Sequence, residues 1–365
     1  MPNEVIVGVY LERSGGSVMR AIVTGEDGEI SGRKKLEATH YKDIDWDPSN
    51  VEEAHEGVRA LAKIAASMGK HNLKSVAIAA PGPFLSLRRS NSDGRFGIIH
   101  PTVSHLPLRG FNLRQIFHEG ISESGGNPNT FITVHTDAEA CAIGEAVARN
   151  LPDKSTLAFL LVTEGIGLGI VRGRTPLSSA LHSEIGVLSV RWDAADPLKP
   201  ERTDRHYAKS LSEMADNSSL RARYGLSLAA ADGSADVPKV TDADLLAAPN
   251  HPLWEFRAYY LAQACLACAV ILAPHQIVLG ADVDVERSIA ERTNRQFRAF
   301  LTARRIEKQP VFEFDEIGAT GYISRSEPIP SLPDTRPFRA TGALGMCHAA
   351  ASAGYGAKHP ITKES

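Results

Sequence analysis

The chain has 365 residues, of which 43% are hydrophobic and 23% charged, the ordinary balance of a globular protein with a substantial core. Lys and Arg number 40 against 43 Asp and Glu, and like charges never form a long run, so no nucleic-acid arm or membrane-binding patch is expected. Four cysteines exclude a disulfide scaffold, and Asn3 and Glu4 do not resemble a secretory start. We therefore expect a cytoplasmic protein.

The chain opens with two β-rich segments, Val5–Leu11 and Val18–Val23, and the glycines between them predict a tight turn at Gly15 and Gly16. A glycine hairpin lets backbone N–H groups approach a phosphate closely, and the hydroxyl of Ser17 would add a donor. A tight turn without a ligand explains the same residues. Both interpretations stay open at this point.

Alternating helical and strand patterns follow. Apolar residues at helical spacing predict a helix over residues 51–68, and the apolar run Val76–Ala80 predicts a buried strand that stops at a Pro-Gly-Pro turn. A second strand, Phe131–Val134, leads to Asp137 and a further helix. The Asp137 carboxylate would either take the proton from a substrate hydroxyl or cap that helix.

The strand–glycine–strand opening recurs in the middle of the chain. Strands are predicted at Leu157–Val162 and Gly169–Val171, joined by the segment Thr163–Gly169. Three glycines at alternate positions of this segment weaken a strand, so phosphate binding explains them better than packing does. The recurrence predicts two similar α/β halves with substrate held between them.

The uncharged stretch Ala258–Ala281 could be mistaken for a membrane span. Pro274 predicts instead a buried helix that ends there, followed by a strand at Ile277–Leu279. Cys265 and Cys268 lie on this apolar helix, where core packing explains them better than metal binding. We therefore expect no membrane span.

Two more features concern the site and the end of the chain. His182 and Glu184 would hydrogen-bond sugar hydroxyls in a cleft, or lie on a solvated loop. A last helix is predicted at Ala340–Ser352, and the tail over residues 357–365 is expected to be disordered.

Seven segments in the same order resemble the ROK family (repressors, open reading frames and kinases), most closely its fructokinase-like branch. The resemblance runs from Val5 to about Ala351. The segments are Gly15–Ser17, Ala80–Pro83, Thr136–Glu145, Gly165–Gly169, His182–Gly186, Trp254–Val283 and Thr341–Gly345.

The resemblance implies an α/β protein of the actin-like, ribonuclease H-like ATPase fold, with two lobes and a central cleft for ATP and sugar. The lobes would be residues 1–136 with about 338–356, and residues 137–337. ATP and Mg²⁺ are the implied cofactors, a small sugar is the implied partner, and a homodimer is the implied assembly. Catalysis would consist largely of positioning and charge neutralisation.

The same resemblance implies roles for individual residues. Asp137 matches the catalytic base. The implied sugar-side residues are Gly82, Pro83, Thr136, His182 and Glu184. The implied nucleotide-side residues are Gly15, Gly16, Ser17, Glu164, Gly165, Gly167 and Gly280.

Two departures from the family pattern concern the nucleotide. Glu164 stands where the family's kinases have threonine, which removes a hydroxyl and adds a carboxylate near the phosphates. At about 4 Å and an effective dielectric constant of about 20, each unit of repulsion costs roughly 4 kcal/mol, unless Glu164 turns away or holds Mg²⁺. Asp282 follows Gly280 and Ala281, where the family has further glycines. Glu12, ahead of the first glycines, is expected to replace the family's acidic residue near Mg²⁺.

Two other departures concern zinc. Val187 replaces the family's zinc-binding histidine, and residues 190–215 contain no cysteine, so the family's structural zinc site is lost and no metal ligand is predicted.

The sequence therefore predicts an ATP-dependent kinase that phosphorylates a hydroxyl of a fructose-like hexose, with Asp137 as general base. The altered phosphate loop keeps open a catalytically impaired sugar-binding or sensor protein on the same fold, and also a kinase redirected to an unusual sugar or amino sugar. About ten residues precede the first glycine segment, so no helix-turn-helix and no DNA binding are expected.

Overall fold

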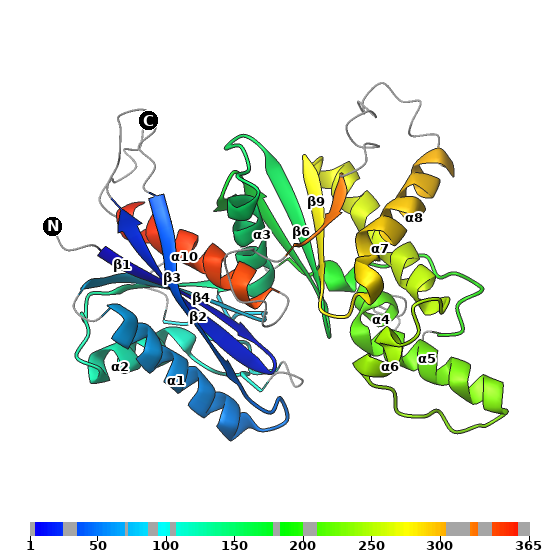
Figure 1. Cartoon of the computed structure of the whole chain (residues 1–365), viewed down its shortest axis with the longest axis horizontal. Helices are drawn as coiled ribbons and strands as arrows, with labels where there is room; N and C mark the ends of the chain where they lie inside the picture. Colours follow the sequence, from blue (N-terminus) through cyan, green and yellow to red (C-terminus); the bar gives the residue numbers. More distant parts are fainter. Residues whose placement is uncertain are drawn as a thin grey trace. The chain divides into compact units, whose positions relative to one another are not determined.

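A computed structural model of the chain describes residues 4–24, 35–69, 72–86, 94–102, 107–177, 183–199, 210–303, 322–327 and 338–356. These residues form two compact units, each built on a mixed sheet (Figure 1). The first unit comprises residues 1–153, 171–182 and 328–365, and the second comprises residues 154–170 and 183–327. The chain thus passes between the units several times.

The first unit holds a five-stranded sheet in the order β3-β2-β1-β4-β5. Strands β1, β2 and β3 pair antiparallel, whereas β4 pairs parallel with both β1 and β5. The strands are β1 (Glu4–Glu12), β2 (Gly15–Thr24), β3 (Lys35–Asp45), β4 (Leu73–Ala80) and β5 (Phe131–Thr136). The helices are α1 (Val51–Gly69), α2 (Leu113–Glu123), α3 (Asp137–Ala148) and α10 (Arg339–Gly356).

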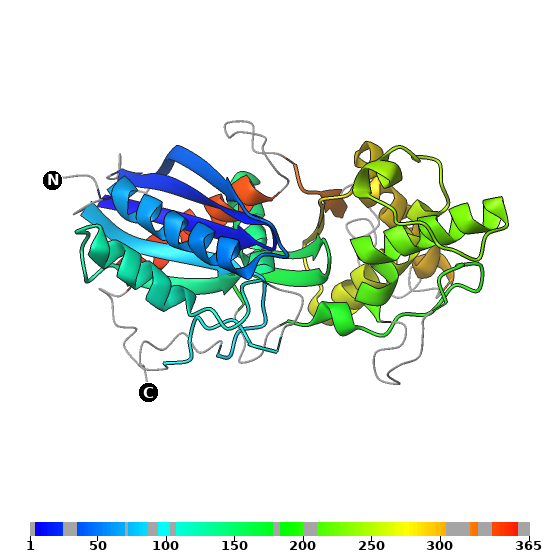
Figure 2. The same cartoon turned by 90° about the horizontal axis from the view of Figure 1, so that it is seen from below.

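The residues of β1 are buried on both faces of this sheet. Val5, Val7 and Val9 join the core formed with α1 and α2, which lie side by side in Figure 2. On the other face, a Cβ at Gly8 would overlap the backbone of α10. The sheet is therefore covered by helices on both sides, which explains why β1 reads as a continuous apolar run.

Helix α3 packs closely on α10 in the first unit. A Cβ at Gly144 would overlap the backbone oxygen of Thr341, and one at Gly345 would overlap the backbone oxygen of Ala140. Because of this packing the first compact unit extends to Asp153, whereas the sequence analysis put the lobe boundary at 136/137.

The second unit is built around the sheet β10-β9-β6-β7-β8. The strands of this sheet are β6 (Thr156–Val162), β7 (Ile166–Arg172), β8 (Thr175–Pro176), β9 (Gln276–Ala281) and β10 (Ile323–Arg325). The last two residues of β7 and all of β8 belong to the segment 171–182, which is part of the first unit. The α-helices are α4 (Leu211–Ala215), α5 (Asn217–Asp232), α6 (Asp242–Leu246), α7 (Leu253–Leu272) and α8 (Ile289–Ala303). Two 3₁₀ turns are η2 (Ile185–Val187) and η3 (Val285–Arg287).

The two sheets share one strand order. Read in reverse, the second sheet has the order β8-β7-β6-β9-β10, which matches the order β3-β2-β1-β4-β5 of the first sheet. Strand β1 lies between its hairpin partner β2 and the parallel strand β4, and β6 lies in the same way between β7 and the parallel strand β9. The two α/β halves expected from the recurring strand–glycine–strand segment are therefore present.

Helix α7 is long and apolar enough to cross a membrane by length and composition alone. Twelve of its residues are buried, including Arg257, Cys265 and Cys268, and the chain leaves the helix at Ala273 to enter β9. Burial raises the pKa of the Cys268 thiol to about 12, which makes it an inert core residue. The predicted buried helix followed by a strand is what the structure shows.

Candidate active site

Asp137 lies at the corner where β5 leads into α3. The hydroxyl oxygen of Thr136 accepts a hydrogen bond from the backbone N–H of Glu139 at 3.1 Å, which makes Thr136 the N-cap of α3. Asp137 is then the first helical residue, half-buried, and its Oδ1 accepts from the backbone N–H of Ala138 at 2.8 Å. The capping role that the sequence left open for Asp137 thus belongs to its neighbour.

Two buried groups next to Asp137 stay neutral. The Cys141 thiol donates to the Tyr10 hydroxyl at 3.7 Å, and both side chains are buried. Burial raises the pKa of each group well above its usual value, and the charge on Asp137 raises both further. At neutral pH the Tyr10 and Cys141 side chains are therefore protonated.

The first glycine segment differs from its predicted form. The β1–β2 hairpin turns at Arg13 and Ser14, whereas Gly15 and Gly16 are the first, buried residues of β2 and pair with Glu12 and Leu11. The predicted turn at the glycines is thus wrong, because Arg13 and Ser14 form the two-residue turn ahead of them.

Arg339, at the start of α10, holds this hairpin in place. Its guanidinium donates to Glu12 Oε1 at 2.5 and 2.9 Å and to Asp45 Oδ1 at 2.8 Å. A Cβ on Gly15 would overlap the same guanidinium, and the buried Ser17 hydroxyl donates to the Arg339 carbonyl at 3.2 Å. Packing around Arg339 accounts for Gly15. Glu12, which was expected beside Mg²⁺, is here the partner of an arginine.

The second glycine segment is more open. The Thr163 N–H donates to the Gly165 carbonyl at 2.8 Å, and the Thr163 carbonyl accepts from the N–H of Asn217, the first residue of α5, at 2.9 Å. A Cβ on Gly165 would meet no atom within 4 Å, and Gly165 and Gly167 are half-buried. Packing does not require a glycine at position 165, which leaves its surface available for a ligand.

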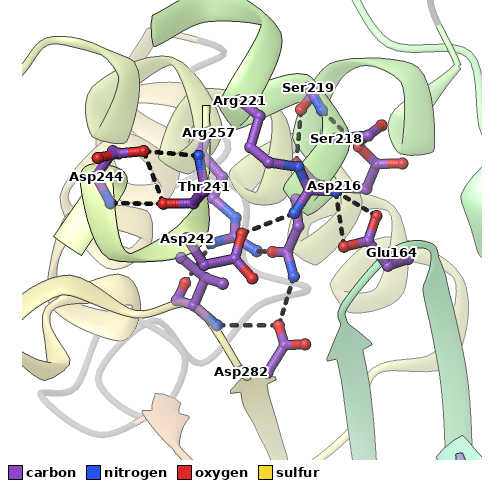
Figure 3. Close-up of polar contacts among 12 residues, drawn as sticks. Glu164, Asp216, Ser218, Ser219, Arg221, Thr241, Asp242, Asp244, Arg257 and Asp282 are labelled. Carbon is purple, nitrogen blue, oxygen red and sulfur yellow. Dashed lines mark hydrogen bonds and ion pairs between the residues drawn. The ribbon is translucent and has the colours of Figure 1, made fainter. Parts of the chain in front are cut away.

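Glu164 is paired with an arginine from α5. Both Glu164 carboxylate oxygens accept from Arg221 Nη2, at 2.7 and 2.5 Å, while Arg221 Nη1 donates to Asp242 Oδ1 at 2.7 Å (Figure 3). The Glu164 carboxylate is thus held by an arginine of α5. Arg221 was missed, because nothing local links positions so far apart in the chain.

A polar cluster ties the end of β9 to the start of α5. Asp282 Oδ1 accepts from Asn217 Nδ2 at 2.7 Å, and the buried Arg257 donates to Asn217 Oδ1 at 2.9 Å and to the Val283 carbonyl at 2.5 Å. The buried Asp216 caps α5 by accepting from the Ser219 N–H at 2.8 Å (Figure 3). Burial raises the pKa of Asp216 to about 6. Asp282 is thereby anchored inside its own unit.

In each unit, several of the predicted site residues follow or lie near the carboxyl ends of parallel strands. In the first unit, the Gly82–Pro83 turn follows β4 and Asp137 follows β5, where Ala80 and Thr136 pair. In the second unit, β6 and β9 are parallel neighbours in which Leu161 pairs with Gly280, and Gly165 lies in the loop that follows the end of β6. Ligands in α/β sheets bind at such edges.

Of the two remaining sugar-side residues, the structure describes one. Glu184 is exposed and directly precedes η2, whose Gly186 is buried against Ser212. His182 lies outside the described residues, as does the tail over residues 357–365. Within the described ranges, no three His, Cys, Asp or Glu side chains form a metal-binding group.

These features fit one family. The model of the family described as "ROK family" matches residues 11–320, most of the chain. The chain belongs to the ROK family.

Among curated relatives, this ROK protein is 25% identical to a protein named putative fructokinase from Bacillus subtilis (strain 168), over 230 residues. That match covers 63% of this chain and 67% of the relative. Three proteins named fructokinase, from Streptococcus mutans, Lactococcus lactis and Pediococcus pentosaceus, match over 50 or 51% of their own length.

Solved structures show the fold. The ROK hexokinase from Thermus thermophilus is 17% identical with a TM-score of 0.62, over 95% of this chain and 98% of that one. A ROK glucokinase from Streptomyces griseus, solved with glucose and AMPPNP, is 16% identical with a TM-score of 0.56, over 94% and 99% of the chains. The fold also occurs in a ROK transcriptional regulator, with 15% identity and a TM-score of 0.59 over 97% of this chain and 80% of that one. The expected actin-like α/β fold is therefore confirmed.

Proposed function

We propose that this ROK protein is an ATP-dependent kinase that transfers the γ-phosphate to a hydroxyl of a fructose-like hexose. One observation carries the catalytic assignment: Thr136 is the N-cap of α3, and the half-buried Asp137 carboxylate, whose Oδ1 accepts from the Ala138 N–H, lies at the strand–helix corner as the first helical residue. The relatives named fructokinase support the acceptor, and the glucokinase solved with glucose and AMPPNP supports the reaction class.

Asp137 acts as the general base in this proposal. The acceptor hydroxyl oxygen forms a bond to the γ-phosphorus while its proton passes to the Asp137 carboxylate, and the bond to ADP breaks. A carboxylate is suited to this role because it is ionised at neutral pH. Mg²⁺ bound to the phosphates would neutralise their charge. We assign it no protein ligand, since Glu12 is held by Arg339.

The residues proposed to bind nucleotide and sugar lie at or after the ends of strands. Backbone N–H groups of the open Gly165–Gly167 segment would bind phosphates, with Gly280 on the adenosine side. The Gly82–Pro83 turn and Glu184 would hold the sugar. Thr136 keeps its capping bond and would contact sugar only through its remaining surface, and His182 remains a sequence-based assignment.

A second candidate is a sugar-binding protein that does not turn over ATP. The observation that favours it is the first loop, where Gly15, Gly16 and Ser17 are buried and the Ser17 hydroxyl is committed to the Arg339 carbonyl. Such a protein would bind a sugar through the Gly82–Pro83 turn and Glu184 without transferring a phosphate.

Location and assembly are proposed from the sequence. We propose a cytoplasmic protein that binds neither DNA nor membrane, supported by the even charge balance and few cysteines. We propose a homodimer by analogy with the family alone.

ADP release with Mg-ATP and a panel of hexoses, hexosamines and polyols separates the candidates. A kinase releases ADP with one sugar or a few related sugars, and the accepted sugar also raises the melting temperature. A sugar that raises the melting temperature while no sugar supports ADP release, and ATP has no thermal effect, would show the sugar-binding protein instead.

A further inference from the structure

The pair formed by Glu164 and Arg221 connects the second glycine loop to α5. Glu164 stands between Thr163 and Gly165, and the half-buried Arg221 holds both of its carboxylate oxygens through one guanidinium nitrogen. The other terminal nitrogen of Arg221 binds Asp242 at the start of α6. The Arg221 guanidinium therefore forms ion pairs with two carboxylates (Figure 3).

The position of Arg221 follows from the helix that carries it. The first residue of α5, Asn217, donates its N–H to the Thr163 carbonyl, so the helix begins at the loop. Arg221 is four residues further on, which places it on the same face of α5 as Asn217. The arginine is thus directed at Glu164 by the start of the helix.

Arg221 changes the electrostatics of the loop. Without it, the side chains of Glu164 and Asp242 would present two uncompensated negative charges next to an open glycine segment. Polyphosphate would then be repelled from the surface that its binding requires. With Arg221 in place, the Glu164 carboxylate is neutralised and held on α5.

We propose that Arg221 is a positioning residue for nucleotide binding, which compensates the unusual Glu164 and keeps its carboxylate from opposing the phosphates at the second glycine loop. This inference rests on the proposed kinase function, because it concerns the nucleotide of that reaction. The ligand it concerns is a nucleoside triphosphate, and the effect grows with the number of its phosphates.

The test measures affinities by calorimetry on the full chain. Mg-ATP and AMP are titrated into the wild type, Arg221→Met, Arg221→Lys, Glu164→Gln and the double variant Glu164→Gln/Arg221→Met. Arg292→Met is the matched control, because Arg292 forms a similar 2.8 Å ion pair with Glu255 that involves no loop residue. Melting temperatures confirm that each variant is folded.

Arg221→Met is expected to weaken Mg-ATP binding about tenfold, or ~1.4 kcal/mol, and AMP binding by less than about threefold. In the double variant Glu164→Gln/Arg221→Met, the uncompensated charge of Glu164 is removed, and Mg-ATP affinity is expected to return to within about threefold of the wild type. Arg221→Lys retains most of the affinity because it retains the charge. The Arg292 control changes neither ligand.

Three outcomes would overturn the proposal. Mg-ATP affinity in Arg221→Met within twofold of the wild type would mean that Arg221 does not affect the nucleotide. A loss that Glu164→Gln fails to restore would mean that Arg221 acts by another route; both results leave the kinase proposal intact. A folded wild type that binds no Mg-ATP would overturn the kinase proposal and this inference with it.

Discussion

Asp216 links burial to the pH dependence of stability. It is buried at the N-terminus of α5, where it accepts hydrogen bonds from the Ser219 N–H and the Ser218 hydroxyl. Burial, together with the nearby charge of Glu164, raises its pKa from 3.8 to about 6 even though the hydrogen bonds from Ser219 and Ser218 lower it. The folded protein therefore binds this proton more tightly than the unfolded chain does. The stabilisation is complete below about pH 4 and is lost as the pH rises through about 6.

Asp216→Asn should flatten that pH dependence, because asparagine keeps a capping oxygen and does not titrate. Between about pH 4.5 and about pH 7, the wild type should lose about 2 kcal/mol of unfolding free energy that the variant does not lose. Urea unfolding at the two pH values measures the difference. Parallel pH profiles for the two proteins would contradict the assignment.

Gly165→Ala separates packing from ligand binding at the second loop. A Cβ there meets no atom within 4 Å, so the unfolding free energy should change by less than about 0.5 kcal/mol. If phosphates approach this backbone, KM for ATP should rise about tenfold while KM for the sugar stays the same. Steady-state kinetics measures both constants. An unchanged KM for ATP would show that phosphates do not contact position 165.

The sequence could locate these residues but not their partners. It identified Glu164 as a departure, and Asp137 and Gly165 by their places after strands. It could not show that Arg221 compensates Glu164 or that Thr136 takes the capping role from Asp137. Local pattern determines where a strand or helix ends, whereas ion pairs depend on tertiary packing between distant segments.

At the scale of elements, the contact between α3 and α10 depends on glycine. Gly345→Ala would place a methyl group against the backbone oxygen of Ala140 and 2.8 Å from the Gly144 nitrogen, and a backbone cannot move as a flexible side chain can. The variant should lose about 1–3 kcal/mol of unfolding free energy. Ser352→Ala, at an exposed position of the same helix, is the control and should change it by less than about 0.5 kcal/mol. Equal stability of the two variants in urea would contradict the close packing.

The β1–β2 hairpin shows where element prediction failed. Both strands were predicted, because β-rich residues mark them clearly. The turn was placed at Gly15 and Gly16, yet it lies at Arg13 and Ser14, and the glycines are required by the Arg339 guanidinium and by neighbouring β1 and α1 side chains. A glycine needed for close approach looks the same in a sequence as a glycine needed for a turn.

At the scale of the whole molecule, the first unit is completed by the end of the chain. Helix α10 covers the face of the sheet opposite α1 and α2, packing against β1 and β4. A chain ending at residue 337 lacks that helix and should leave this apolar face exposed, so β1 and β4 should lose hydrogen-exchange protection. A chain ending at residue 356 keeps α10 and should retain it. Equal protection in both would show that α10 is dispensable.

The family assignment and the presence of two similar α/β halves could be predicted from the sequence, because motif order and strand patterns survive when overall identity is low. The sequence predicted only part of the division of the chain between the two units. It predicted that residues 338–356 return to the first unit, but it did not predict that α3 belongs to that unit. That inclusion depends on the glycine contact with α10, which has no local signal.

The most direct test of the proposed kinase is phosphoryl transfer by Asp137→Asn. With Mg-ATP and the sugar that the wild type accepts, ADP release should fall at least about a hundredfold. Affinities for the sugar and for Mg-ATP should stay within about threefold, because only the base is removed. An Asp137→Asn variant that transfers phosphate at the wild-type rate, or a wild type that transfers it to no sugar, would contradict the account.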